Sequence, residues 1–396
     1  MPVSAAMTLP SSLFVTGCYR SGTTLLDKLF HAHPQISMAS QPLPLLYTSF
    51  KEAFYRERGL QRRYPLEHLF LENAYTQADF NDFLDRHIMS TAELDSMFAA
   101  LKDYVLQDWT PQVVEMRAAF QAGTFFDIYS QLNRCIARVF PKTHLAYVGS
   151  KEVLCEEYIP YLLMRGIKVV LIIRDPRDVI ASVNFRQGNG FVGANRPVLY
   201  SLRIWRKSMA FALAYEQHPG LRWLRFEDLV VEPVRHLNEI AGWLEIPAYP
   251  MDAFDNGILD QSGRQWRGNS SFDLQKGVSA ASMGRFAQRL PRAVLEFIEA
   301  CCWPEMLCAG YTPAGGKHLE AESIATYQDP FQDIHERFPK EYSSISEHRE
   351  EELVRYEKLC GVESLSEEMA RYWFIHERAY QRLKAAVFKG DKALDN

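Results

Sequence analysis

The stretch Leu-Phe-Val-Thr-Gly-Cys-Tyr-Arg-Ser-Gly-Thr-Thr-Leu-Leu, residues 13–26, decides the fold of this chain. Residues 13–16 are a short, mostly apolar run typical of a buried strand, and residues 17–22 form a loop bounded by glycines. From residue 25 onward, apolar residues recur at helical spacing. A loop between a strand and a helix N-terminus presents backbone N–H groups and the positive end of the helix dipole. The stretch therefore predicts an anion-binding loop.

The loop matches only part of the pattern of a nucleotide-phosphate loop. Gly17 and Gly22 have the expected spacing, but Thr23 and Thr24 follow where such loops place a lysine and then a serine or threonine. The missing lysine argues against a site for the γ-phosphate of Mg-ATP, and Arg20 supplies a cation from within the loop instead. We expect this site to hold phosphate or sulfate.

Composition places the chain among ordinary globular proteins. The 396 residues are 47% hydrophobic and 23% charged, with a formal net charge of −5, so we expect neither nucleic acid nor an acidic membrane as partner. The seven cysteines show no metal-ligand spacing, which favours reduced thiols in a cytoplasmic protein. We also expect no signal peptide and no membrane span, because neither pattern occurs in the sequence.

Strands and helices alternate along much of the chain. Further strands are predicted at 146–150, 168–173 and 221–226, and helices at 25–34, 45–58, 152–164, 197–217, 232–244 and 291–308. This order predicts an α/β fold, a P-loop-like three-layer core around a central parallel sheet. We expect one α/β domain over 1–316, with a helical insertion or cap at 45–140 on the acceptor side. Residues 317–396 then form a C-terminal helical extension that includes one long amphipathic helix around 369–386.

A second informative stretch covers residues 168–186. Its strand delivers Arg174 to the carboxyl end of the sheet, where ligands of parallel sheets bind. In the following helix, Ser182 and Arg186 are four residues apart and share a face, so these three side chains could clamp a phosphate. The alternative is that Arg174 pairs with neighbouring charges of the Arg-Asp-Pro-Arg-Asp run on a surface turn.

Together the two stretches resemble the sulfotransferases that use 3′-phosphoadenosine-5′-phosphosulfate (PAPS), over roughly residues 12–35 and 146–312. Residues 20–24 resemble the 5′-phosphosulfate loop in the form found in tyrosylprotein sulfotransferases. Residues 225–229 resemble a Tyr-Glu-Asp-Leu segment of the family, with Phe226 where tyrosine is usual. The resemblance implies these cofactor-binding residues: Arg20, Ser21, Gly22, Thr23, Thr24, Arg174, Ser182, Arg186, Trp266, Ser270 and Arg289.

The resemblance also implies catalytic roles. Lys151, at the end of a predicted strand, matches a lysine beside the sulfuryl group, and Arg20 would contact the same group. The tyrosylprotein branch has a glutamate as general base where this chain has Gln41, and an amide cannot take a proton. The base is therefore left unassigned, with four weak candidates: Glu52, Glu57, His144 and Glu152.

The predicted reaction is in-line transfer of the sulfuryl group from PAPS to a hydroxyl or amine, releasing 3′,5′-adenosine bisphosphate. Cationic side chains would replace the metal of kinases, so no metal is expected. The acceptor, a small molecule, carbohydrate or peptide, is not identified by the sequence, and neither is the oligomeric state. Two other classes stay open: a P-loop-type kinase, which lacks its lysine at Thr23 here, and a nucleotide-binding protein without transferase activity, which Gln41 favours.

Overall fold

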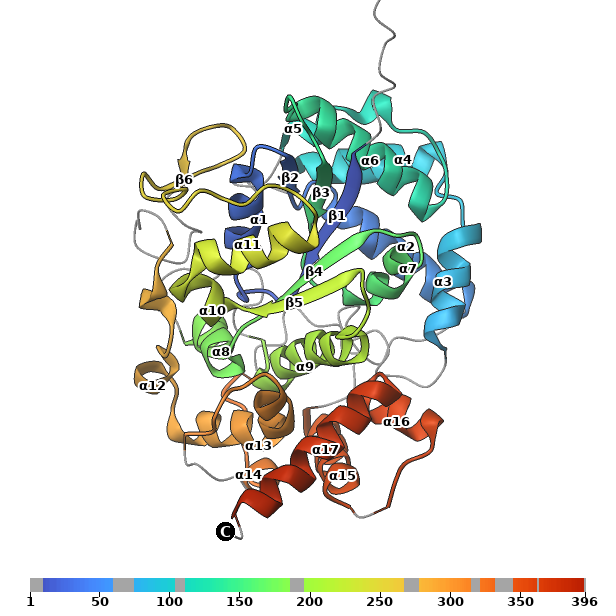
Figure 1. Ribbon diagram of the computed structural model, residues 1–396. Coiled ribbons are helices and arrows are strands. Elements are labelled where there is room, and N and C mark those ends of the chain that lie inside the picture. The colour runs from blue at the N-terminus through green and yellow to red at the C-terminus, as the bar shows by residue number, and fades with distance from the viewer. Residues whose placement is uncertain are drawn as a thin grey trace, which may run out of the picture.

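The computed structural model describes residues 10–59, 75–103, 111–185, 196–266, 278–314, 321–331, 345–361 and 363–394. Within them, five parallel strands form the central sheet in the order β2-β3-β1-β4-β5 (Figure 1). The strands are β1 (Ser11–Thr16), β2 (Ile36–Ser40), β3 (Tyr147–Lys151), β4 (Lys168–Ile173) and β5 (Leu221–Arg225). The predicted α/β fold with a central parallel sheet is confirmed.

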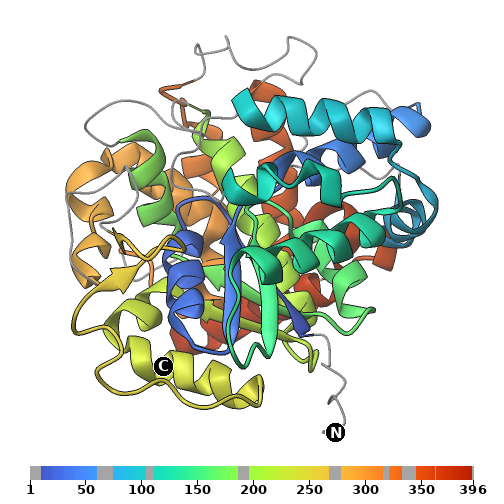
Figure 2. The same cartoon turned by 90° about the horizontal axis from the view of Figure 1, so that it is seen from above.

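Alternate residues of the central strands face two separate apolar layers. Leu13 and Val15 of β1 pack with α1 (Thr23–Ala32), α10 (Phe226–Val231) and α11 (Pro233–Trp243). Phe14, between them, packs on the other face. The helices of that second layer are α2 (Pro44–Glu57), α6 (Phe125–Val139), α7 (Ile159–Leu163), α9 (Val198–Tyr215) and α13 (Arg292–Cys308). Figure 2 shows helices on both sides of the sheet, which is the predicted three-layer arrangement.

The strand β2 was not predicted from the sequence. Its five residues, Ile-Ser-Met-Ala-Ser, are all buried, and the two serines hide its strand character. Ser37 is accommodated because its hydroxyl donates to the carbonyl of Phe140 at 2.6 Å. The strand pairs in parallel with β3, so its carboxyl end brings Gln41 beside Lys151.

The region predicted as a helical insertion is mostly helical in its described part, with one isolated β-bridge between Met89 and Gly123. Besides α2 and α6 it contains α3 (Gln77–Arg86), α4 (Thr91–Asp103), α5 (Pro111–Val114) and a 3₁₀ turn (Arg117–Ala119). Capping boxes at Thr76 and Thr124 begin α3 and α6. The helix predicted at 152–164 is shorter than expected: a 3₁₀ turn at Glu156–Tyr158 leads into α7, after Leu154 takes a positive φ of 61°.

Lys142 lies at the amino ends of the strands, where it joins the C-terminus of α1 to the start of β2. Its ammonium donates to the carbonyls of His31, His33 and Ile36 at 2.5, 2.8 and 2.5 Å, across the C-terminus of α1 and the start of β2. A cation at a helix C-terminus satisfies carbonyls that have no partner within the helix. Lys142 is thus a half-buried structural lysine at the amino ends of the strands, opposite to Lys151 at their carboxyl ends.

Six further helices lie in the described part of the chain. They are α8 (Pro176–Asn184), α12 (Phe286–Arg289), α14 (Glu322–Ala325), α15 (Ile345–Cys360), α16 (Glu367–Phe374) and α17 (Glu377–Leu394), with a short strand pair of β6 (Ile258–Leu259) and β7 (Gln265–Trp266) and a 3₁₀ turn (Ala280–Ser282). None of the described helices is long and apolar enough to cross a membrane.

The long C-terminal helix predicted around 369–386 is wrong, because the chain forms two helices there. Ser366 caps α16, and Ile375 ends it with a φ of 69° before α17 begins. The helix α17 packs against α9 and α13, so α9 lies between the sheet and the C-terminal helices (Figure 1). Glu352 of α15 is buried against Arg203 and Arg206 of α9, and these guanidiniums hold the pKa of its carboxyl well below the usual range.

Candidate active site

The predicted anion loop lies between β1 and α1, at the carboxyl end of the sheet. Its two glycines are required by close contacts. A Cβ at Gly17 would lie 2.5 Å from the carbonyl oxygen of Ile172, and one at Gly22, where φ is 97°, would lie 2.3 Å from the ring of Phe226. Larger residues would therefore push the loop away from β4 and α10.

The N-terminus of α1 faces this loop without a side-chain cap. Gly22 is the N-cap residue and has no side chain, while the Ser21 hydroxyl donates to the carbonyl of Cys18 at 2.5 Å. The first-turn amides at Thr23 and Thr24 therefore lie at the positive end of the helix dipole, with no capping side chain among the described residues. This is the local structure that binds anions.

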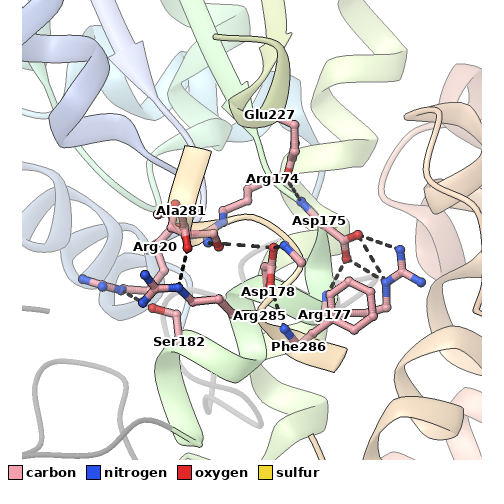
Figure 3. A network of polar contacts seen from close by, with 12 residues as sticks. Arg20, Arg174, Asp175, Arg177, Asp178, Ser182, Glu227, Ala281, Arg285 and Phe286 are labelled. Atoms are coloured by element: carbon pink, nitrogen blue, oxygen red, sulfur yellow. Dashed lines mark hydrogen bonds and ion pairs between the residues drawn. The ribbon is translucent and has the colours of Figure 1, made fainter. Parts of the chain in front are cut away.

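Arg174 reaches the loop from the end of β4 (Figure 3). Its two Nη atoms donate to the carbonyl of Arg20 at 3.0 Å and to that of Ser282 at 2.7 Å, and its guanidinium stacks on Phe226 at 4.6 Å from the ring centre. The side chain is 4% exposed, and this burial lowers its pKa. Its buried Nε has no hydrogen-bond partner among the described residues.

Arg20 connects the loop to α8. Its Nε donates to the hydroxyl of Ser182 at 3.0 Å, and its backbone adopts a positive φ of 63° (Figure 3). The structure therefore brings Arg20 together with Arg174 and Ser182, which follow it by 154 and 162 positions in the sequence. Arg186, the fourth predicted phosphate ligand, lies outside the described residues.

The charges around Arg174 are buried and do not form a surface turn. Arg177 pairs with Asp175 at 2.7 Å and with Glu299 at 2.7 Å, and all three side chains are less than a tenth exposed. Asp178 accepts from the amides of Gly284 at 2.7 Å and Phe286 at 3.0 Å. The surface-turn alternative is wrong, because these pairs brace β4, α8 and α13 and hold residues 282–286 against the site.

The residues expected near the nucleotide from later in the chain are Phe226, at the family's tyrosine position, and the predicted ligands Trp266, Ser270 and Arg289. Phe226 begins α10 and packs under Arg174, as described above. Trp266 is half-buried in β7, and Arg289 ends α12, which packs against α8. Ser270 lies outside the described residues.

Lys151 lies at the carboxyl end of β3 and is fully buried. Its Nζ donates to the Oε1 atom of Gln41 at 2.9 Å, and its carbonyl accepts from the Gln41 amide at 2.7 Å. Burial lowers the pKa of the ammonium, while the nearby carboxylates of Asp27 and Glu152 act in the opposite direction. Asp27, buried on α1, was not singled out from the sequence, because it lies one residue past the apolar run of that helix.

The four candidate bases differ sharply in position. His144 is wrong, because it is exposed and precedes β3, so it lies at the opposite edge of the sheet from Lys151, roughly 20 Å away at strand spacing. Glu52 and Glu57 are both exposed on α2, and Glu57 pairs with Arg86, so neither is buried beside Lys151. Glu152 is buried beside Lys151, and burial raises the pKa of its carboxyl.

Comparison with solved structures gives matches of low sequence identity. The sulfotransferase domain from the curacin biosynthetic pathway is 19% identical and covers 72% of this chain and 93% of its own, with a TM-score of 0.39. The sulfotransferase domain of the Synechococcus PCC 7002 olefin synthase is 17% identical, covering 73% and 91%, with a TM-score of 0.42. Retinol dehydratase, solved with androsterone and the inactive cofactor PAP, is 15% identical, covering 76% and 81%, with a TM-score of 0.36.

Comparison with curated proteins gives no match. A family model described as "Sulfotransferase family" matches residues 10–250, which is more than half of the chain. This span contains the loop at 17–22, Lys151, Arg174 and Ser182. The chain therefore belongs to the sulfotransferase family and is a transferase of sulfuryl groups.

Proposed function

We propose that the sulfuryl donor is PAPS and that it binds across the loop between β1 and α1. Arg20 and the amides at residues 21–24 would hold the 5′-phosphosulfate, while Arg174, Ser182 and Arg186 would hold the 3′-phosphate. The observation that carries this proposal is the meeting of Arg20, Arg174 and Ser182 at one helix N-terminus. Trp266, Ser270 and Arg289 are proposed to contact the same nucleotide.

The residues present fit such a ligand. Arg174 keeps a buried Nε without a partner among the described residues, and an unpaired buried donor is costly unless a ligand satisfies it. A planar guanidinium suits a phosphate because it can donate two parallel hydrogen bonds. Ser182 adds a hydroxyl group that accepts from Arg20 and can donate to a phosphate oxygen, and the N-terminus of α1 adds backbone amides.

Bound PAPS supplies the activated sulfuryl group, and the protein supplies positioning and charge stabilisation. The Lys151 ammonium would stabilise the negative charge that grows on the leaving phosphate oxygen during in-line attack. Gln41 holds that ammonium in place through the 2.9 Å hydrogen bond. Among the four carboxylate and imidazole candidates, Glu152 is the one buried next to Lys151, which makes it the best placed to take the acceptor proton.

We further propose that the acceptor approaches from the helical insertion at 45–140. The first helix of this region, α2, begins three residues after Gln41, and it packs on the same face of the sheet as α6. The acceptor would be a hydroxyl or amine of a small molecule, carbohydrate or peptide. We propose that the reaction needs no metal ion, because Arg20, Lys151 and Arg174 supply the positive charges. We also propose that it takes place in the cytoplasm.

The first prediction tests the reaction. The purified protein is incubated with PAPS and, in separate arms, a phenol, a sugar alcohol, a tyrosine peptide and a primary amine. We expect equal amounts of adenosine bisphosphate and of sulfated product in the arm that contains a suitable acceptor, measured by chromatography. The same arms are repeated with Mg-ATP added beside PAPS, and turnover of Mg-ATP with PAPS left intact would instead support the kinase alternative. Tight nucleotide binding without turnover in any arm would support the non-catalytic alternative.

A further inference from the structure

A residue far downstream caps the helix α9. Asp329 accepts a hydrogen bond from the backbone amide of Val198, the first residue of α9, at 2.7 Å. Its other oxygen accepts from the amide of Phe331 at 3.0 Å, and its carboxylate is buried. The first turn of α9 contains no acidic residue, and its N-cap residue, Pro197, has no side chain able to accept a hydrogen bond. Asp329 therefore supplies the cap that the local sequence lacks.

The first turn of α9 also touches the phosphate loop. The Ser201 hydroxyl lies 2.6 Å from the hydroxyl of Tyr19, the loop residue immediately before Arg20. One turn further along α9, Trp205 donates its Nε1–H to the carbonyl of Arg174 at 2.7 Å. The orientation of α9 thus determines the positions of Tyr19 and Arg174.

A second contact leads to the same loop through α8. The ring of Phe331 packs edge-on against Phe185 with centroids 5.4 Å apart, and Phe185 directly follows α8. Ser182, three residues earlier on α8, accepts the hydrogen bond from Arg20. Asp329 and Phe331 therefore hold the start of one helix and the end of another, and both helices contact consecutive residues of the phosphate loop.

We propose that the segment 327–331 is a positioning element of the nucleotide site, in which Asp329 and Phe331 fix Tyr19 and Arg20 through Ser201 and Ser182. This inference rests on the proposed function, because the loop is taken to be the nucleotide site. The segment lies outside residues 10–250, the span that the family model matches. It is thus a feature of this chain beyond the matched region, and its role is to pre-organise the loop before the nucleotide binds.

The second prediction concerns variants of the whole chain in which the residue that caps α9, Asp329, is replaced. Asp329→Ala should weaken binding of 3′,5′-adenosine bisphosphate about tenfold, because loss of a helix cap loosens the turn that carries Ser201. Asp329→Asn should recover most of the affinity, since asparagine also caps well. The matched control is Ser366→Ala, which removes the cap of α16 in the same C-terminal region and should lower the melting temperature without changing nucleotide affinity.

A double-mutant cycle separates positioning from general loss of stability. Tyr19→Phe removes the hydroxyl that contacts Ser201, so adding it to Asp329→Ala should cost little further affinity. Calorimetric titration well below the melting transition of each variant measures all these affinities. Wild-type affinity in folded Asp329→Ala, or additive losses in the cycle, would overturn the positioning role. If Asp329→Ala does not fold, Phe331→Ala tests the same segment through α8: it should weaken nucleotide binding, and wild-type affinity in folded Phe331→Ala would overturn the proposal. Failure of the wild-type protein to bind the bisphosphate would overturn the proposed function instead.

Discussion

Arg20→Ala should lower the rate of sulfuryl transfer roughly a hundred- to a thousandfold, the usual loss, about 3–4 kcal/mol, when one such charge-stabilising donor is deleted. The guanidinium lies in the phosphate loop, where its contact should strengthen as charge develops in the transition state. Its backbone carbonyl, which binds Arg174, is unaffected by the substitution. The loss should therefore appear in turnover more than in affinity for adenosine bisphosphate, which lacks the sulfuryl group.

Arg20→Lys is the informative companion variant. A lysine keeps the positive charge but cannot form the bidentate fork, so much of the turnover should return. If Arg20 only braces the loop through Ser182, then Arg20→Ala should lower the melting temperature and weaken every ligand alike. Wild-type sulfuryl transfer in folded Arg20→Ala would show that this loop is not the sulfuryl site.

Lys151→Met should cause a loss of similar size, roughly a hundredfold or more in turnover, because the leaving oxygen would lose its buried cation. The matched control is Lys142→Met. Lys151 is fully buried and Lys142 is half-buried, and Lys142 binds backbone carbonyls at the opposite end of the same sheet. Lys142→Met should lower the free energy of unfolding and leave turnover per folded molecule unchanged.

The pH dependence of turnover provides a second measure of Lys151. Burial lowers the pKa of its ammonium, so the protonated form is lost at a lower pH than for an exposed lysine. Wild-type turnover should therefore fall on the alkaline side before the ordinary lysine range, and the residual activity of Lys151→Met should lack this limb. Equal activity losses in Lys151→Met and Lys142→Met would point to a structural role for both.

The parts of the fold that were predictable have local signals. The apolar runs of β1 and β4 and the glycines at 17 and 22 predicted the strand, loop and helix correctly. The strand β2 was missed because its serines interrupt the apolar pattern, although a backbone carbonyl satisfies Ser37. The break between α16 and α17 was missed because the apolar spacing continues through Ile375, whose positive φ of 69° nevertheless ends α16.

The site was predictable where strand direction places a residue. Lys151 ends one parallel strand and Arg174 directly follows another, so both were expected at the carboxyl ends of the strands. His144 was considered as a base before the direction of β3 was taken into account. That direction places His144 near the amino end of the strand, whereas Lys151 lies at its carboxyl end. Asp329 contacts Val198 across 131 positions of the sequence, and Ser201 contacts Tyr19 across 182 positions. No local sequence pattern predicts contacts over such separations.

The most direct test of the proposed donor site compares three nucleotides by thermal melting of the wild-type protein. A bound ligand stabilises the folded state by mass action, so the shift in melting temperature reports affinity. Because Arg174 and Ser182 are assigned to the 3′-phosphate, 3′,5′-adenosine bisphosphate should raise the melting temperature far more than 5′-AMP or Mg-ATP at the same concentration. Equal shifts for the bisphosphate and 5′-AMP would contradict the assignment of a PAPS site to this loop.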